Sequence, residues 1–360
     1  MNPAEVTTDK SLADDVDTLI RVANLDVTFS RKEIFKPVRQ VRAVNDVSFT
    51  IGRGETLGLV GESGSGKSTT GRALLRLVPV TGGTVEVAGT DVASMHGKEL
   101  RQARRNMQMI FQDPYSSLDP SATVGASIAE PMRVHLDMSP KQAFDRTVEL
   151  LDLVGLRASH VNRYPYEFSG GQRQRVAIAR ALALNPKFIV CDEAVSALDV
   201  STQNQVINLL EDLREELDLT YLFIAHDLAI VRHISNRVAV MYLGHIVEVG
   251  PAERIYTQPA HPYTWALLSA IPDASPYRAK RDRIILRGDL PDPSDPPAGC
   301  PFQTRCPYVM DICRSQMPPM TEVAGGGTVA CHLQSTGPNL AGEPLGDLTP
   351  ATFAEQGWSV

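Results

Sequence analysis

Long apolar runs are absent from this 360-residue sequence. No stretch approaches the ~18 consecutive apolar residues of a membrane-spanning helix, so we expect no helix that crosses a bilayer. The N-terminal segment 1–17 holds five acidic residues and no apolar core, which argues against a secretory signal peptide. We therefore expect a chain that is made and kept in the cytosol, where disulfides are rare.

An excess of positive charge is also lacking. Lys and Arg total 35 against 42 Asp and Glu, for a formal net charge of -7, so the overall field is a poor match for nucleic acid. The chain is 43% hydrophobic and 21% charged, which excludes a disordered protein. At roughly 100–200 residues per domain, the length favours one large domain and a smaller one.

Several shifts in composition divide the chain. Residues 1–18 are predicted to form a flexible acidic tail, and strand-like alternation begins at residue 19. A helical insert is expected at about residues 114–180, where strand signals fade. Frequent prolines after residue 270 predict a boundary there, followed by a small cysteine-bearing module at 271–335 and a tail at 336–360.

Continuous apolar runs at 56–60, 188–191 and 221–225 predict buried strands. An amphipathic helix is expected at 202–217, between the last two runs. Strand, helix and strand in this order predict an α/β fold with a parallel sheet. Alternating segments within 19–51 predict further strands, and residues 237–249 predict a hairpin.

The pattern Gly61-x4-Gly66-Lys67-Ser68 follows a predicted buried strand and precedes a predicted helix. The glycines let successive backbone N–H groups converge on an anion, and the helix N-terminus adds its dipole. Lys67 would reach the outer phosphates, and Ser68 would offer a hydroxyl to Mg²⁺. The sequence therefore predicts a nucleotide site on residues Gly61, Glu62, Ser63, Gly64, Ser65, Gly66, Lys67, Ser68 and Thr69.

Polar side chains end three of the predicted strands. Asp192 and Glu193 follow the run 188–191, His226 follows 221–225, and Gln112 follows 109–111. Ligands gather at the carboxyl ends of parallel strands. Asp192 is therefore expected to serve Mg²⁺, directly or through water, and Glu193 to polarise an attacking water.

A second anion site is predicted about 100 residues after the first. Ser169 is placed as the N-cap of a strongly helical stretch, and Gly170 and Gly171 expose its first backbone donors. One nucleotide cannot easily occupy both sites, so the spacing favours two subunits, each facing the partner's nucleotide.

These motifs, in this order, resemble those of the ATP-binding cassette (ABC) transporter ATPases over about residues 19–270. The resemblance implies a P-loop NTPase (RecA-like) α/β core with an antiparallel β subdomain and a helical signature subdomain. It also assigns a dimer-contacting loop to Ser196 and Asp199, and the signature to Ser169, Gly170, Gly171 and Gln172.

The resemblance further implies a role for each site residue. Asp192, Ser68 and Gln112 would hold Mg²⁺. Glu193 would be the general base, His226 would contact the γ-phosphate, and Lys67 would assist catalysis. Phe35 is the candidate for stacking on adenine. The family often has proline after the glutamate, whereas this chain has Ala194, which changes the stiffness of the loop but leaves the carboxylates intact.

Residues 111–120 and 191–200 narrow the resemblance to oligopeptide and dipeptide importer ATPases, and to the second of their two ATPase subunits. This branch implies a partner ATPase, two membrane permeases, an external peptide-binding protein and a peripheral position on the cytoplasmic face of the cell membrane. Pairing with a second copy of the same chain stays open. A nickel or other small-solute importer is the nearer alternative. A soluble ABC protein acting on ribosomes or DNA is disfavoured by the single cassette and the short insert.

Four of only five cysteines lie in the last quarter of the chain, spaced Cys300-x5-Cys306-x6-Cys313-x17-Cys331. Structural zinc sites usually contain C-x2–4-C pairs, which are missing here, whereas the ligand spacings of iron–sulfur clusters vary more widely. The importer resemblance also implies a 4Fe–4S cluster. Zinc, metal-free thiols and His332 as a substitute ligand remain alternatives, and Cys191 is expected to be a core residue.

Overall fold

The computed structural model describes residues 17–31, 39–271, 286 and 288–335. Its larger sheet has eight strands in the order β11-β12-β10-β9-β3-β8-β7-β6. The pairs β9/β3, β3/β8, β8/β7 and β7/β6 are parallel, as the alternation of strands and helices predicts. The strands are β3 (Thr56–Val60), β6 (Met107–Ile110), β7 (Phe188–Asp192), β8 (Thr220–Ala225), β9 (Arg237–Tyr242), β10 (His245–Pro251), β11 (Met320–Glu322) and β12 (Thr328–Ala330).

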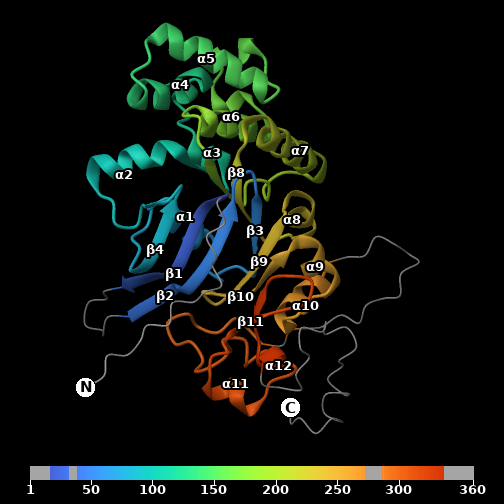
Figure 1. Ribbon diagram of the computed structural model, residues 1–360. Coiled ribbons are helices and arrows are strands. Elements are labelled where there is room, and N and C mark those ends of the chain that lie inside the picture. Colours follow the sequence, from blue (N-terminus) through green and yellow to red (C-terminus); the bar gives the residue numbers. More distant parts are fainter. Residues whose placement is uncertain (1–16, 32–38, 272–285, 287, 336–360) are drawn as a thin grey trace.

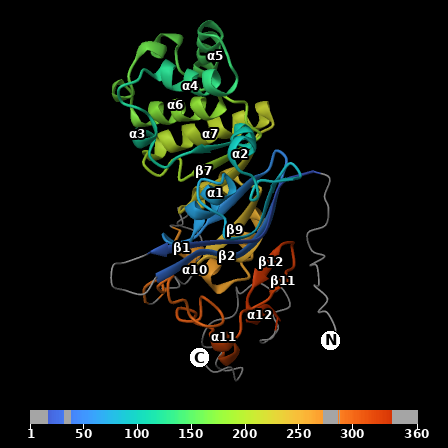
Figure 2. The same ribbon diagram turned by 90° about the vertical axis from the view of Figure 1, so that its left-hand side faces the viewer.

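A second, antiparallel sheet has the strand order β2-β1-β4-β5. It contains β1 (Thr18–Arg31), β2 (Arg39–Gly52), β4 (Gly82–Val87) and β5 (Thr90–Asp91). Its inward side chains share a core cluster with Leu57 and Leu59 of β3 and Leu74 of α1 (Lys67–Leu74). The mixed and antiparallel sheets together form an α/β fold, with α1 packed between them (Figure 2).

Four α-helices and two 3-10 helices within residues 114–182 gather in a separate layer at the top of Figure 1. Ser139 caps α5 and Ser169 caps α6, each through a capping box. The layer comprises α3 (Pro114–Ser117), α4 (Val124–His135), α5 (Pro140–Leu153), α6 (Gly170–Leu182) and two 3-10 helices (Ala158–Asn162, Pro165–Glu167). The others are α2 (Gly97–Ala103), the 3-10 helix Arg104–Asn106, α7 (Val200–Leu217), α8 (Leu228–Ile234), α9 (Ala252–Thr257), α10 (Pro262–Ser269), α11 (Asp311–Ser315) and α12 (His332–Ser335).

The cysteine-bearing segment continues the core. Strand β12 pairs with β10, and β11 pairs with β12, so the segment extends the larger sheet at the end remote from the helical layer (Figure 2). Phe302 packs edge to face on Tyr242 of β9, with ring centroids 5.2 Å apart. The predicted 237–249 hairpin is confirmed as β9 and β10, which lie between β12 and β3 in the sheet.

Candidate nucleotide-binding site

The loop 61–66 connects β3 to α1, in the strand–loop–helix context that the sequence predicts. Gly61, Gly64 and Gly66 have φ angles of 152°, 81° and 107°. A Cβ on Gly61 would lie 2.1 Å from the Met241 carbonyl oxygen, and one on Gly66 would lie 2.3 Å from the Ala43 carbonyl oxygen. No other residue fits at these two positions, because both the backbone angle and the surrounding space require glycine.

Lys67 lies inside this loop with only 4% of its surface exposed. Its Nζ donates hydrogen bonds of 2.8 Å to the carbonyl oxygens of Gly61 and Glu62. Burial lowers the pKa of Lys67, while the carboxylates of Glu193, Asp192 and Glu62 act in the opposite direction. The loop therefore encloses a cation that is held next to acidic groups at the end of the sheet.

Ser68 and Asp192 meet at the carboxyl edge of the sheet. The Ser68 hydroxyl donates a 2.6 Å hydrogen bond to Asp192 Oδ1, and Arg72 Nη2 lies 3.4 Å from Asp192 Oδ2. Asp192 is buried. A hydroxyl and a carboxylate are oxygen ligands of the kind that Mg²⁺ takes, so this pair fits the ion that the motif implies.

The side chain of Glu193 contacts two residues that follow other strands of the sheet. Gln112 Nε2 donates a 2.7 Å hydrogen bond to Glu193 Oε2, and His226 Nδ1 lies 3.6 Å from the same oxygen. Glu193 has φ = 47°, a left-handed conformation that is uncommon for a residue with a side chain. Its N–H donates to the Ile224 carbonyl of β8 at 2.9 Å. Three strand ends are therefore joined at one carboxylate, and Gln112 contacts Glu193 rather than Asp192.

The signature begins helix α6. The Ser169 hydroxyl accepts from the Gln172 N–H at 3.3 Å, and the Gln172 side chain accepts from the Ser169 N–H at 3.1 Å. A Cβ on Gly171 would lie 2.2 Å from Thr202 Cγ2, so Gly171 packs against the start of α7. Of the four signature residues, Gly171 is buried, whereas the other three reach the surface.

The predicted dimer loop lies between β7 and α7. Asp199 is the N-cap of α7 and accepts hydrogen bonds from the Thr202 N–H at 3.0 Å and from the Ser201 and Thr202 hydroxyls at 2.6 and 2.7 Å. These bonds hold the pKa of Asp199 far below its usual value. Ser196 donates to the Glu193 carbonyl at 2.9 Å, so this loop continues directly from the strand-end carboxylates.

Two further predictions concern the adenine-stacking residue and the cysteine cluster. Phe35, the adenine-stacking candidate, lies outside the described residues. The iron–sulfur site is not confirmed, because among the described residues no group of three or more His, Cys, Asp or Glu side chains is arranged to hold a metal ion. His332 instead lies 3.0 Å from the Gln316 carbonyl oxygen through Nε2.

Cys300, Cys313 and Cys331 are nevertheless buried, and Cys306 is partly buried. Cys300 N–H donates to the Cys313 carbonyl at 2.8 Å, and Tyr308 N–H donates to Cys306 Sγ at 3.4 Å. Burial raises the pKa of Cys300 to about 11 and also raises that of Cys331, and the neighbouring thiols add to both shifts. Without a metal these cysteines are protonated at neutral pH.

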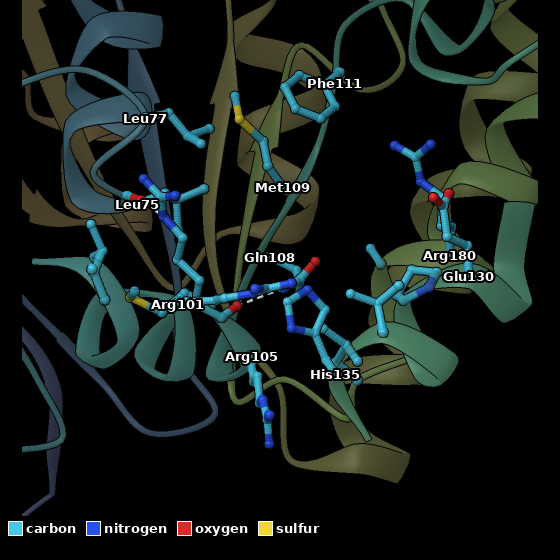
Figure 3. A pocket seen from close by; sticks show the side chains of 18 residues that line it. Leu75, Leu77, Arg101, Arg105, Gln108, Met109, Phe111, Glu130, His135 and Arg180 are labelled. Carbon is cyan, nitrogen blue, oxygen red and sulfur yellow. Dashed lines mark hydrogen bonds between the residues drawn. The ribbon is translucent and has the colours of Figure 1, made fainter. Parts of the chain in front are cut away.

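A groove of about 770 Å³ separates the core from the helical layer. Figure 3 shows Leu75 and Arg101 on one side and Glu130, His135 and Arg180 on the other. Arginines dominate its charged lining. Burial, Arg101 and Arg105 lower the pKa of His135, as expected in a positive field. Gln112 follows β6, whose Met107 and Met109 also line the groove.

Sequence reasoning missed three groups that touch the site. Arg72 contacts Asp192, while Arg305 and Tyr263 contact Glu62 of the loop. Arg72 lies one helical turn after Ser68 and could have been found from that spacing. Arg305 and Tyr263 are far from residues 61–69 in the sequence. The only sequence feature that marked Arg305 is that it directly precedes Cys306.

Two family models match the chain. The model of the ABC transporter family matches residues 44–196, and that of the oligopeptide/dipeptide transporter C-terminal region matches residues 247–313. The described helices include none that is long and apolar enough to cross a membrane.

Known proteins resemble the chain along most of its length. The oligopeptide transport ATP-binding protein AppF of Bacillus subtilis is 52% identical over 83% of this chain and 92% of its own length. The putative oligopeptide transport ATP-binding protein YkfD of the same organism is 54% identical over 82% and 90%. A dimeric, post-hydrolysis structure of the ATP-binding cassette MJ0796 bound to ADP and phosphate aligns with a TM-score of 0.58 at 30% identity, over 65% of this chain and 99% of that chain.

Proposed function

Since the chain belongs to the ABC transporter family, in the branch of oligopeptide and dipeptide importer ATPases, we propose that residues 61–69 hold the phosphates of ATP and that Glu193 drives hydrolysis. The protein is an ATP-binding subunit of a peptide importer, and its ATPase activity is coupled to peptide import. The convergence of Gln112, His226 and Glu193 beside the Ser68–Asp192 pair supports the residue assignment most strongly.

Hydrolysis is an in-line attack of water on the γ-phosphorus. Glu193 accepts a proton as the water oxygen bonds to phosphorus, and the bond from phosphorus to the bridging oxygen of ADP breaks. Gln112 and His226 orient the Glu193 carboxylate, and His226 is placed to contact the γ-phosphate. Lys67 and the loop N–H groups stabilise the charge that develops on the phosphoryl oxygens. Ser68 and Asp192 would hold Mg²⁺, with Gln112 joining when the site closes, and the ion would supply positive charge beside the phosphates.

ABC ATPases dimerise. We assign the accessible signature residues, Ser169, Gly170 and Gln172, to the partner's ATP, because the exposed N-terminus of α6 offers backbone donors to an anion. Ser196 and Asp199 contact the partner across the same interface. ATP is then enclosed between the two subunits, and closure on ATP and reopening after hydrolysis form the power stroke.

ABC ATPases also pair with permease subunits. We assign the groove between core and helical layer to an acidic or carbonyl-rich helix end of a permease, because arginines dominate its lining next to the strand that carries Gln112. We also propose a peripheral position at the cytoplasmic face of the cell membrane, with a second ATPase, two permeases and an external peptide-binding protein as partners. Arg105→Glu should reduce the co-purification of permeases, whereas Lys141→Glu, on the exposed face of α5, should not; equal recovery from both variants would contradict the assignment.

We further propose that Cys300, Cys306, Cys313 and Cys331 ligate a structural 4Fe–4S cluster. Three of these cysteines are buried and Cys306 is partly buried. The four thiols also lie close enough that ionisation of one would raise the pKa of its neighbours, which supports this assignment. Among the described residues, no group of three or more of these side chains is arranged to hold a metal ion. Anaerobically purified protein should absorb near ~400 nm, and stoichiometric zinc or metal-free protein without that band would refute the proposal.

The catalytic assignment is tested with Glu193→Gln in the assembled transporter. Steady-state ATPase activity should fall by roughly 10²–10⁴-fold, while equilibrium ATP binding is retained because the loop is untouched. Glu216→Gln, an exposed carboxylate on α7, is the matched control and should keep normal turnover. Normal turnover in Glu193→Gln would exclude Glu193 as the base. Peptide uptake into reconstituted vesicles, measured beside nickel uptake, separates the peptide importer from the small-solute alternative.

A further inference from the structure

A salt bridge joins the cysteine-bearing segment to the phosphate loop. Arg305 Nη1 donates to Glu62 Oε2 at 2.7 Å, and Nη2 donates to Glu62 Oε1 at 3.2 Å. The two residues are 243 positions apart in the sequence. The side chain of Arg305 is 8% exposed and that of Glu62 is 29% exposed. This fork geometry, largely shielded from water, is the stronger kind of ion pair.

Other contacts hold the same part of the loop from the same side. The Glu62 N–H donates a 2.8 Å hydrogen bond to the Tyr263 hydroxyl of α10. The Ser65 carbonyl accepts from the Gly244 N–H, in the β9–β10 turn, at 2.9 Å. A Cβ on Gly64 would lie 3.5 Å from Leu290 Cδ2. Residues 62–65 of the phosphate loop are therefore held by contacts with residues from 244 onward.

The position of Arg305 is set by its own segment. Its N–H donates to the Phe302 carbonyl at 3.0 Å, and Phe302 packs against Tyr242 and Tyr263. The guanidinium carbon lies 6.0 Å from the Tyr242 ring centroid. Burial alone would lower the pKa of Arg305, but its hydrogen bonds to the Glu62 carboxylate raise it above the usual value. The packing of these aromatic rings thus helps to fix the position of the Arg305 guanidinium beside the phosphate loop.

We propose that Arg305 is a positioning residue for nucleotide binding: by holding Glu62, it keeps the phosphate loop in its binding shape and ties that shape to the cysteine-bearing segment. The inference rests on the proposed role of residues 61–69 as the ATP loop. Arg305 also neutralises Glu62, whose carbonyl accepts from Lys67. Without Arg305, an unpaired carboxylate would stand beside the incoming phosphates and repel them.

The test measures ATP affinity and steady-state kinetics of the full-length protein. Arg305→Met should weaken ATP binding about tenfold, which corresponds to about 1.4 kcal/mol, and should raise KM more than it lowers kcat. Arg305→Lys, which keeps the charge but loses the fork, should recover part of the affinity. Arg314→Met, an exposed arginine of α11, is the matched control and should bind ATP normally.

A double-mutant cycle separates positioning from general stability. Glu62→Gln removes the repelling charge, so the double variant Arg305→Met with Glu62→Gln should bind ATP better than Arg305→Met alone. Additive losses, or wild-type affinity in Arg305→Met, would overturn the proposal. If Arg305→Met does not fold, the comparison of Arg305→Lys with the wild type decides in its place, and equal affinity refutes the role. Failure of the wild-type protein to bind ATP would instead refute the proposed function of the loop.

Discussion

Gln112 and Glu193, which follow the neighbouring parallel strands β6 and β7, are joined by a hydrogen bond of 2.7 Å from Nε2 to Oε2. Gln112 also follows the strand that lines the groove between core and helical layer. The contact therefore connects the proposed base directly to the surface that we assign to the permease. A movement of the helical layer that shifts Gln112 would reorient the carboxylate.

Replacing Gln112 with Glu places a second carboxylate against Glu193. Two like charges at hydrogen-bond distance resist simultaneous ionisation, so the acidic limb of the ATPase pH profile should move to higher pH. Gln112→Ala should lower the rate without moving that limb, because it adds no charge. The measurement is kcat between pH 5.5 and pH 9 for both variants, and coincident limbs would contradict the contact.

Gly171→Ala tests the packing of the signature helix. The added Cβ would meet Thr202 Cγ2 at 2.2 Å, and overpacking of this kind typically costs about 1–3 kcal/mol. Thr202→Ser removes that methyl group and keeps the hydroxyl that donates to Asp199. The double variant should therefore recover stability in urea unfolding. Gly170→Ala, with 3.4 Å to Leu198, should be tolerated, and a failure of the rescue would argue against this packing.

His261 makes the fold sensitive to acid. It is the N-cap of α10, its Nδ1 accepts from the Tyr263 N–H at 3.0 Å, and burial lowers its pKa to about 3. Between that value and its unfolded value of 6.5, the unfolded chain binds the additional proton, so stability falls as the pH falls through this window. The loss between pH 7.5 and pH 5 should be about 2 kcal/mol.

The control for this effect is His261→Asn, which keeps a capping acceptor and removes the titration. Urea unfolding at both pH values should show that the variant loses less stability than the wild type on acidification. An equal loss in the two proteins would assign the acid sensitivity to other groups.

Arg254 of α9 and Glu248 of β10 form a buried ion pair. Arg254 also donates to the Gly326 carbonyl at 3.1 Å, and Glu248 accepts from the Ala260 and His261 N–H groups at 2.8 and 3.0 Å. Arg254→Met leaves a buried carboxylate unpaired and should cost about 3–5 kcal/mol of unfolding free energy. Adding Glu248→Gln should restore part of it, because Gln is neutral.

The control for the buried pair is the exposed Lys141–Asp145 pair of α5. Lys141→Met should change the unfolding free energy by less than about 1 kcal/mol. A similar cost for Arg254→Met and Lys141→Met would show that the buried pair contributes no more than a surface pair.

Much of the fold follows from local patterns. The apolar runs at 56–60, 188–191 and 221–225 are parallel strands of one sheet, as predicted, because buried parallel strands need continuous apolar sequence. Strands β4 and β5 were not predicted. Both belong to the antiparallel sheet, where the pairing of β4 with β1 and of β5 with β4 outweighs weak local signals such as Gly82-Gly83.

The sequence by itself determined the loop from Gly61 to Ser68 and the carboxylates that end β7, because glycine geometry and strand-end position are local properties. Tertiary structure alone decided which strand ends meet, so that Gln112 contacts Glu193 and not Asp192. It also decided that β12 extends the core sheet and that Arg305 meets Glu62 across 243 residues. Such contacts depend on how separate helices and strands pack together, which the spacing of residues along the chain does not determine.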